Sequence, residues 1–211
     1  MKLIPIVAAV AVAGFTQAAS AITFPATAGL FIVDNATSLT SYVALTGGVA
    51  TYNGNFDANW NLVVTTGQTV VGGGHPSLDL DVAATHLTGT GTLSIYYSDI
   101  GFGPTVANYV LSTFLSSGGP VTTSAYLSAA NTAFGMTTSL GGSTDAAGNS
   151  TTINGTGGIN NSGPYSLTLV DLIGGNVTSM DTSLKVPDGG TTVLLLGAGL
   201  SGLALLRRKL A

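Results

Sequence analysis

The chain has 211 residues, of which 45% are apolar and only 7% are charged, with 30 glycines, no cysteine and a formal net charge of −4. The absence of cysteine excludes a disulfide framework, a thiol nucleophile and a thiolate metal site. No Lys or Arg occurs between Leu3 and Leu184. This argues against nucleic-acid binding and against phosphoryl transfer, because both need clustered positive charge or a bound metal.

The N-terminus has the order of a secretory signal peptide. Met1-Lys2 is followed by a mostly apolar run over residues 3–15 and by Ala19-Ser20-Ala21. A short positive region, an apolar region of this length and an A-x-A site are typical of signal peptides. The apolar run is shorter than the roughly 20 residues of a spanning helix. We therefore predict a signal peptide over residues 1–21, cleaved before Ile22.

Residues 22–185 carry the pattern of an all-β domain. Apolar and polar residues alternate in Leu78-Asp79-Leu80-Asp81-Val82, and similar short stretches recur between glycine-rich turn signals. Thr, Val and Tyr, which favour strands, are frequent. We predict a β-sandwich or jelly-roll-like body. The other predicted strands are residues 30–33, 42–45, 60–65, 92–96, 121–127, 133–138, 165–169 and 181–185.

Two stretches of the body fit more than one structure. Residues 104–117 place Val106, Val110 and Phe114 at helical spacing, so this segment fits a short helix as well as a strand. Residues 141–163 are almost all Gly, Ser, Thr and Asn. This composition predicts a long loop or a weakly ordered hairpin.

Asp79 and Asp81 form the first candidate site. At a spacing of two residues in a strand, both carboxylates lie on one face of the sheet. Paired carboxylates serve a hydrolase as acid and base or bind a calcium ion, and they also occur on the solvated faces of strands. The body has no Glu, Cys or Arg and no internal Lys to complete a catalytic site. We therefore expect no enzymatic activity.

The second candidate is the Asx-rich stretch Asn53-Gly54-Asn55-Phe56-Asp57-Ala58-Asn59-Trp60-Asn61. In an extended chain its Asn and Asp side chains would line one face and bind calcium or sugar hydroxyls, with Asp57 and Trp60 at the site. A loop closed by Asx-turns fits the same residues. Tyr96, Tyr97 and Tyr109 would stack on sugar rings or pack in the core. We expect no cofactor, with calcium as the alternative.

The C-terminus combines three features. Val186-Pro187-Asp188-Gly189-Gly190-Thr191-Thr192 is a turn-forming run, residues 191–206 are an apolar segment near the lower length limit of a spanning helix, and Arg207-Arg208-Lys209 follow. Basic clusters of this kind stay on the cytoplasmic side of a membrane. The tail therefore predicts one transmembrane helix over residues 191–206, a cytoplasmic basic cluster and an exported body.

In this order the three features resemble the tripartite PEP-CTERM class of bacterial sorting signals. The motif at residues 186–192 is most similar to the VPDSG-CTERM variant, with Gly189 in place of its serine. The resemblance implies that residues 186–211 are a sorting signal for an exosortase-type membrane transpeptidase. This enzyme would cut near the motif and release or transfer the body to the cell envelope or extracellular matrix. Exopolysaccharide, which such bacteria make, is a further candidate partner.

Together these observations predict an exported bacterial protein with a structural or adhesive role. It would be anchored transiently in the inner membrane and then reach the cell surface or the medium. A glycan- or calcium-binding module and a secreted hydrolase that uses Asp79 and Asp81 are the alternatives. Once both ends are removed, eight aspartates remain with Lys185, a formal charge of −7 that attracts divalent cations and repels acidic polymers.

Overall fold

A computed structural model describes residues 22–71, 75–88, 91–145 and 150–186. These residues form twelve β-strands. The strands are β1 (Gly29–Asp34), β2 (Thr40–Ala44), β3 (Thr51–Asn55), β4 (Trp60–Val71), β5 (His75–His86), β6 (Leu93–Phe102), β7 (Thr105–Gly118), β8 (Val121–Ser128), β9 (Thr138–Asp145), β10 (Ser150–Asn161), β11 (Tyr165–Ile173) and β12 (Val177–Lys185).

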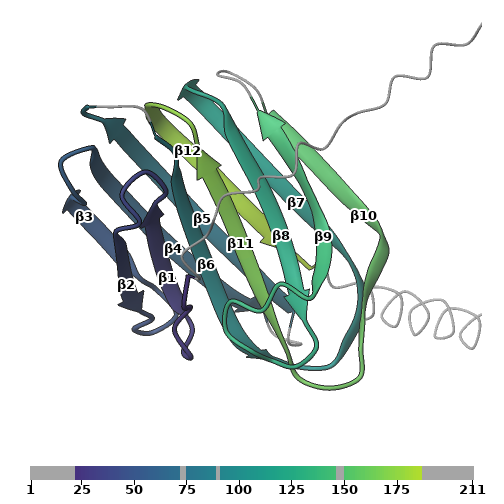
Figure 1. The fold of residues 1–211 in the computed structure, drawn as a ribbon. Coiled ribbons are helices and arrows are strands. Elements are labelled where there is room, and N and C mark those ends of the chain that lie inside the picture. Colours follow the sequence, from purple (N-terminus) through teal and green to yellow (C-terminus); the bar gives the residue numbers. More distant parts are fainter. Residues whose placement is uncertain (1–21, 72–74, 89–90, 146–149, 187–211) are drawn as a thin grey trace, which may run out of the picture.

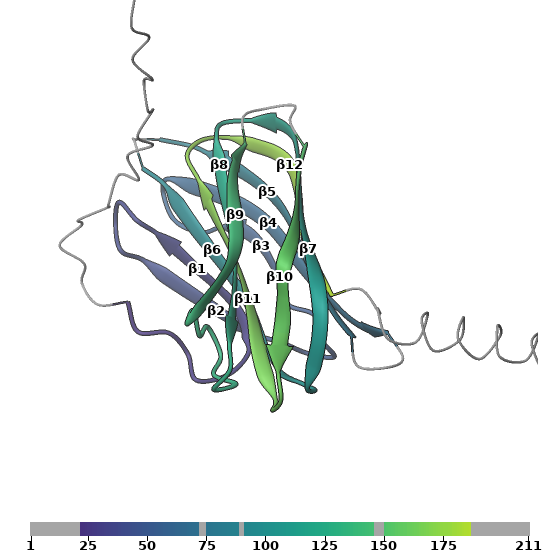
Figure 2. The same ribbon diagram turned by 90° about the vertical axis from the view of Figure 1, so that its right-hand side faces the viewer.

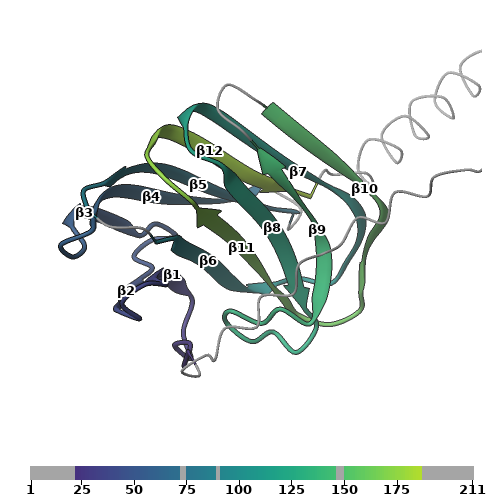
Figure 3. The same cartoon turned by 45° about the horizontal axis from the view of Figure 1, so that its top comes forward.

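The strands form two six-stranded sheets that lie face to face (Figures 1 and 2). Sheet 1 has the order β2-β1-β6-β11-β8-β9, and sheet 2 has the order β10-β7-β12-β5-β4-β3. Their neighbouring strands pair antiparallel. The chain passes from one layer to the other after β2, β5, β6, β7, β9, β10 and β11 (Figure 3). The predicted all-β sandwich is therefore confirmed.

The main core lies between the two sheets and follows the predicted alternation. On β5, Leu78, Leu80 and Val82 are buried, whereas Asp79 and Asp81 are on the outer face. Because successive residues of a strand point to opposite faces, one apolar residue in two is enough to fill the core. The largest buried side chains include Trp60, Tyr97 and Tyr165.

A second, smaller apolar cluster covers part of the outer face of sheet 1. Phe134, in the segment between β8 and β9, packs on Phe31 of β1, with ring centroids 6.0 Å apart. Phe24, which precedes β1, stacks on Phe134 at 5.5 Å and meets Tyr96 of β6 edge to face at 5.0 Å. Both faces of β1 are therefore covered, and all six of its residues are buried.

The predicted strand over residues 133–138 is wrong. Asn131 and Phe134 have φ angles of +54° and +56°, which an extended strand does not allow. The segment instead turns back over sheet 1, where the hydroxyl of Ser98 accepts a hydrogen bond from the Phe134 N–H at 2.8 Å. Because this segment and its neighbours cover the sheet, Ser166 and Thr168 of β11 are fully buried, although their alternation places them on the outer face.

Residues 104–117, which fitted a helix or a strand, form β7 over most of their length. The prediction of a loop or hairpin over residues 141–163 is wrong. β9 pairs with β8 in sheet 1 and β10 pairs with β7 in sheet 2, so the segment supplies an edge strand to each layer. Local composition could not reveal this, because the partner strands provide the hydrogen bonds and the segment itself is poor in apolar residues.

The predicted signal peptide over residues 1–21, the helix over residues 191–206 and the basic cluster of Arg207, Arg208 and Lys209 lie outside the described residues. Pro187 to Thr192 of the sorting motif also lie outside them. Within the described part of the chain, no helix is long and apolar enough to cross a bilayer.

We predict that Phe134→Ala lowers the free energy of unfolding by about 3 kcal/mol, because it removes the central ring of the outer cluster. Urea unfolding followed by tyrosine or tryptophan fluorescence would measure the change. Leu39→Ala is the control, since Leu39 is 45% exposed and its removal should change stability by less than about 0.5 kcal/mol. Equal effects of the two substitutions would contradict a stabilising role for the cluster.

Candidate functional site

Three aspartates meet on the outer face of sheet 2. Asp79 and Asp81 come from β5, and Asp181 of β12 lies directly opposite Asp81 in the strand register. One carboxylate oxygen from each residue lies within 4.8 Å of the others. The spacing of Asp79 and Asp81 predicts their shared face, whereas sequence reasoning missed Asp181. Only the pairing of β12 with β5 brings it to the site.

The environment of this acidic triad favours the uptake of a proton or a cation. Burial raises the pKa of the Asp79 carboxyl, the charges of Asp181 and Asp81 raise it further, and Lys185 partly opposes them, which leaves it at about 6. Burial and the charge of Asp181 also raise the pKa of Asp81. The three carboxylates therefore repel one another when all are ionised.

The triad supplies three oxygens, whereas a calcium ion takes roughly six to eight. A calcium ion held by Asp79, Asp81 and Asp181 would take most of its remaining ligands from water, because the site lies on an outer face. Calcium binding by this protein stays a prediction. The same open position does not enclose a substrate as a hydrolase site does.

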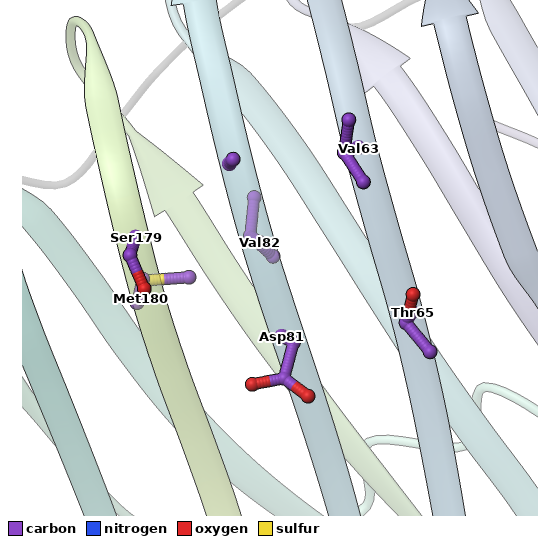
Figure 4. A pocket seen from close by; sticks show the side chains of 7 residues that line it. Val63, Thr65, Asp81, Val82, Ser179 and Met180 are labelled. Atoms are coloured by element: carbon purple, nitrogen blue, oxygen red, sulfur yellow. The ribbon is translucent and has the colours of Figure 1, made fainter.

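A shallow depression of about 160 Å³ lies beside the triad. Figure 4 shows the Asp81 carboxylate between Thr65 of β4 and the adjoining β12 strand, with Val63 farther along β4. The residues that line the depression are Val63, Thr65, Asp81, Val82, Ala83, Ser179 and Met180. The surface at this point therefore combines carboxylate, hydroxyl and apolar groups.

Of the four aromatic residues predicted to stack on sugars, two are fully buried and two are partly buried. Trp60 and Tyr97 are fully buried, and the Trp60 ring lies against His86 with ring centroids 4.4 Å apart. Tyr96 packs in the outer cluster of sheet 1, and Tyr109 packs against the main core. These rings offer little open surface to a ligand.

Phe114 of β7 is an exposed aromatic residue that sequence reasoning did not select as a candidate binding residue. Its side chain is 52% exposed on the outer face of sheet 2, and it is the exposed large aromatic of the described chain. In the strand register it lies opposite Asp181. The sequence indicates the exposure of Phe114 only through its position next to Leu115, because side chains alternate along a strand and Leu115 is buried.

The Asx-rich stretch forms the β3–β4 hairpin rather than a continuous extended ladder. Its turn is closed by Asp57, whose Oδ1 accepts hydrogen bonds from the N–H groups of Asn59 at 2.7 Å and Trp60 at 2.8 Å. This is the Asx-turn alternative. Across the hairpin, the Asn61 amide donates to Asn55 Oδ1 at 2.6 Å.

Asp57 and Asn59 of this turn approach Asp34, the fully buried last residue of β1. The Asn59 side-chain amide donates to Asp34 Oδ2 at 3.0 Å, and the Ala36 N–H donates to Asp34 Oδ1 at 2.7 Å. Burial alone would raise the pKa of Asp34, but the hydrogen bonds outweigh it and the pKa lies below its ordinary value. The network joins the end of β1 to the β3–β4 turn.

The pKa of Asp57 is shifted in the opposite direction to the pKa of Asp34. Burial and the neighbouring Asp34 raise its pKa, and its Oδ2 atom is buried without a hydrogen-bond partner among the described residues. A proton on Asp57 would let this oxygen donate to Asp34, so the pair can be satisfied with one negative charge. Sequence reasoning selected Asp57 but missed Asp34, because only the tertiary structure brings the end of β1 close to the β3–β4 turn.

Asp171 of β11 lies in the main core between the sheets. It is fully buried, and its Oδ1 accepts hydrogen bonds from Thr123 of β8 at 2.7 Å and Thr182 of β12 at 3.4 Å. Burial raises the pKa of this carboxyl to about 7, although the two hydroxyl groups oppose the rise. Asp171 is therefore a titrating group that links the two layers.

The last described residue, Val186, belongs to the body as well as to the predicted sorting motif. Its side chain is 3% exposed in the main core, and its N–H donates to the Pro76 carbonyl at 3.1 Å. Lys185 directly before it ends β12, which lies between β5 and β7 near the middle of sheet 2. The motif therefore follows the sandwich without a linker.

Comparison with known protein families confirms the sorting signal predicted for this tail. The chain ends in a sorting signal, the mark of an exported protein that is anchored at the membrane and acted on by a membrane-associated enzyme. The signal is of the VPDSG-CTERM type, because the family model described as the VPDSG-CTERM motif matches residues 185–210. No curated protein matches the chain.

Among solved structures, the chain is similar to the C-terminal CBM6 of LamC, a marine laminarinase from Zobellia galactanivorans. The identity is 16%, the match covers 72% of this chain and 98% of that chain, and the TM-score is 0.29. It is also similar to TmCBM61 in complex with beta-1,4-galactotriose, at 12% identity over 75% of this chain and 87% of that chain, with a TM-score of 0.26.

We predict that Asp171→Asn removes much of the pH dependence of stability. The folded pKa of about 7 lies above the unfolded value of about 3.9, so the folded state holds the proton more tightly. The contribution of this carboxyl to stability is therefore present below pH 4 and is lost as the pH rises to 7. Melting temperatures measured from pH 4 to pH 8 should fall in the wild type and change less in the variant.

Asp79→Asn is the control for this experiment, because Asp79 titrates near pH 6 and should account for only the lower part of the fall. A slope above pH 6 that is as steep in Asp171→Asn as in the wild type would contradict the assignment.

Proposed function

We propose that this protein is an exported, non-enzymatic component of the bacterial envelope or extracellular matrix, with a structural or adhesive role. An exosortase-type transpeptidase would process its tail and release the sandwich or transfer it to the cell surface. The observation that carries the proposal is the junction at Val186, where a core strand of the body leads directly into the sorting motif. The body and the signal thus account for nearly the whole chain.

A non-enzymatic role is supported by the position of the acidic groups. The triad of Asp79, Asp81 and Asp181 lies on an outer sheet face, whereas a glycosidase places its two carboxylates on opposite sides of the bond that it cleaves. Asp34 and Asp171 are buried and held by hydrogen bonds within the fold. These arrangements suit cation binding and folding better than acid–base catalysis.

Processing of the tail would be visible in the mass of the protein. Intact mass measured separately on membranes, cell surface and medium should find a form that begins near Ile22 and ends after Val186. The double substitution Pro187→Ala and Asp188→Ala should leave the precursor in the membrane. Circular dichroism of this variant should not change, because both residues follow the last strand. An uncut C-terminus in every wild-type fraction would make the protein a permanently anchored one.

The folded body should end at Val186. A protein of residues 22–186 should unfold in urea at the same concentration as the processed protein, because it keeps every described core residue. Truncation after Ser183 should lower the free energy of unfolding by at least about 3 kcal/mol, since it removes the buried Leu184 and Val186. Equal stability of the two truncated proteins would show that Val186 does not belong to the fold.

A further inference from the structure

The outer face of sheet 2 carries a row of side chains that the folding of the sandwich does not explain. The strand register places Thr65 of β4 beside Asp81 of β5, Asp81 beside Asp181 of β12, and Asp181 beside Phe114 of β7. Neighbouring strands lie roughly 4.8 Å apart, so the row extends over roughly 14 Å. That length is sufficient for a ligand of two or three small rings.

Phe114 gives the row an apolar end. An aromatic ring buries a large area when it is covered, and Phe114 is 52% exposed although it lies in the second strand of a six-stranded sheet. Its neighbours along β7, Thr113 and Leu115, are buried on the other face. The ring therefore contributes little to the main core and presents an open face to whatever lies on this sheet.

Asp81 and Asp181 give the row strong hydrogen-bond acceptors. Lys185 is the only Lys or Arg from residue 3 to residue 206, so most of these oxygens cannot be consumed by salt bridges. The hydroxyls of Thr65 and Ser179 border the depression beside Asp81 (Figure 4). A ligand with many hydroxyl groups would donate to the carboxylates and cover Phe114 with its carbon-bound hydrogens.

The charge of the face selects among hydroxyl-bearing ligands. The body has a formal charge of −7, and three of its eight aspartates meet in this row and beside it. Anionic polysaccharides and nucleic acids would be repelled. A sugar chain without carboxylate or sulfate groups offers hydroxyl donors for the carboxylates and a flat ring face for Phe114, and it carries no opposing charge.

We propose that the outer face of sheet 2 binds a neutral polysaccharide, with Phe114 as the stacking platform and with Asp81 and Asp181 as hydrogen-bond acceptors. Polysaccharide binding at this site would provide the adhesive role of the proposed function. The inference rests on the proposed function only for export, which brings the protein into contact with polysaccharide. It differs from the site predicted around Trp60, since the Trp60 ring is fully buried.

The test is affinity electrophoresis of the full chain in mild detergent, through gels that contain laminarin, hydroxyethyl cellulose or alginate. We expect retardation by at least one of the two neutral polymers and none by alginate. Phe114→Ala and Asp181→Asn should each weaken this retardation at least tenfold. Leu39→Ala is the matched control, because it removes an exposed apolar side chain outside sheet 2 and should leave binding unchanged.

Absence of binding to both neutral polymers would overturn the proposal, and so would equal binding by Phe114→Ala and the wild type. Melting temperatures of the variants would show that each is folded. Retardation by polylysine alone would assign the face to a basic partner and would also overturn the proposal. Because processing of the tail is measured by mass, a failure of polysaccharide binding would be distinguishable from a failure of sorting.

Discussion

The sandwich must satisfy buried carboxylates almost without cationic side chains, and much of its polar structure follows from this constraint. Asp34, Asp99, Asp145 and Asp171 are all buried, while Lys185 is the only Lys or Arg of the body. Burying an unpaired charge is costly, so each carboxylate must accept hydrogen bonds or carry a proton. Asp145 accepts from Ser143 and Thr151, and Asp171 accepts from Thr123 and Thr182. The abundance of Thr, Ser and Asn therefore serves the interior as well as the surface.

These hydrogen bonds also connect the two sheets. Asp145 and Thr151 join the edge strands of the two sheets, and Asp171 with Thr182 joins β11 to β12 across the core. At one end of the sandwich, Asp34 and Asn59 tie β1 to the β3–β4 turn. The chain leaves the body at the other end, where Val186 donates to the Pro76 carbonyl at the start of β5. The Asx-rich turn and Val186 therefore lie at opposite ends of the sandwich.

Within the described residues, the outer faces of the two sheets differ, because an apolar cluster covers β1 and its neighbours in sheet 1. Phe24 and Phe134 pack on sheet 1, where even Ser166 and Thr168 are buried. The corresponding face of sheet 2 keeps Phe114 and Asp181 open. A protein held by its C-terminal tail would therefore have one polar sheet face available for contacts with its surroundings.

The sequence by itself determined the all-β class, the outward position of Asp79 and Asp81 and the sorting signal at the C-terminus, because each depends on local alternation or on the order of neighbouring residues. Only the tertiary structure decided that residues 141–163 form two edge strands, that residues 133–138 turn over sheet 1 and that Asp181 joins Asp79. The same holds for the burial of Trp60 and the exposure of Phe114. These outcomes depend on which distant strands pair and which segment covers a face, and residues far apart in the chain make those contacts without leaving a local pattern.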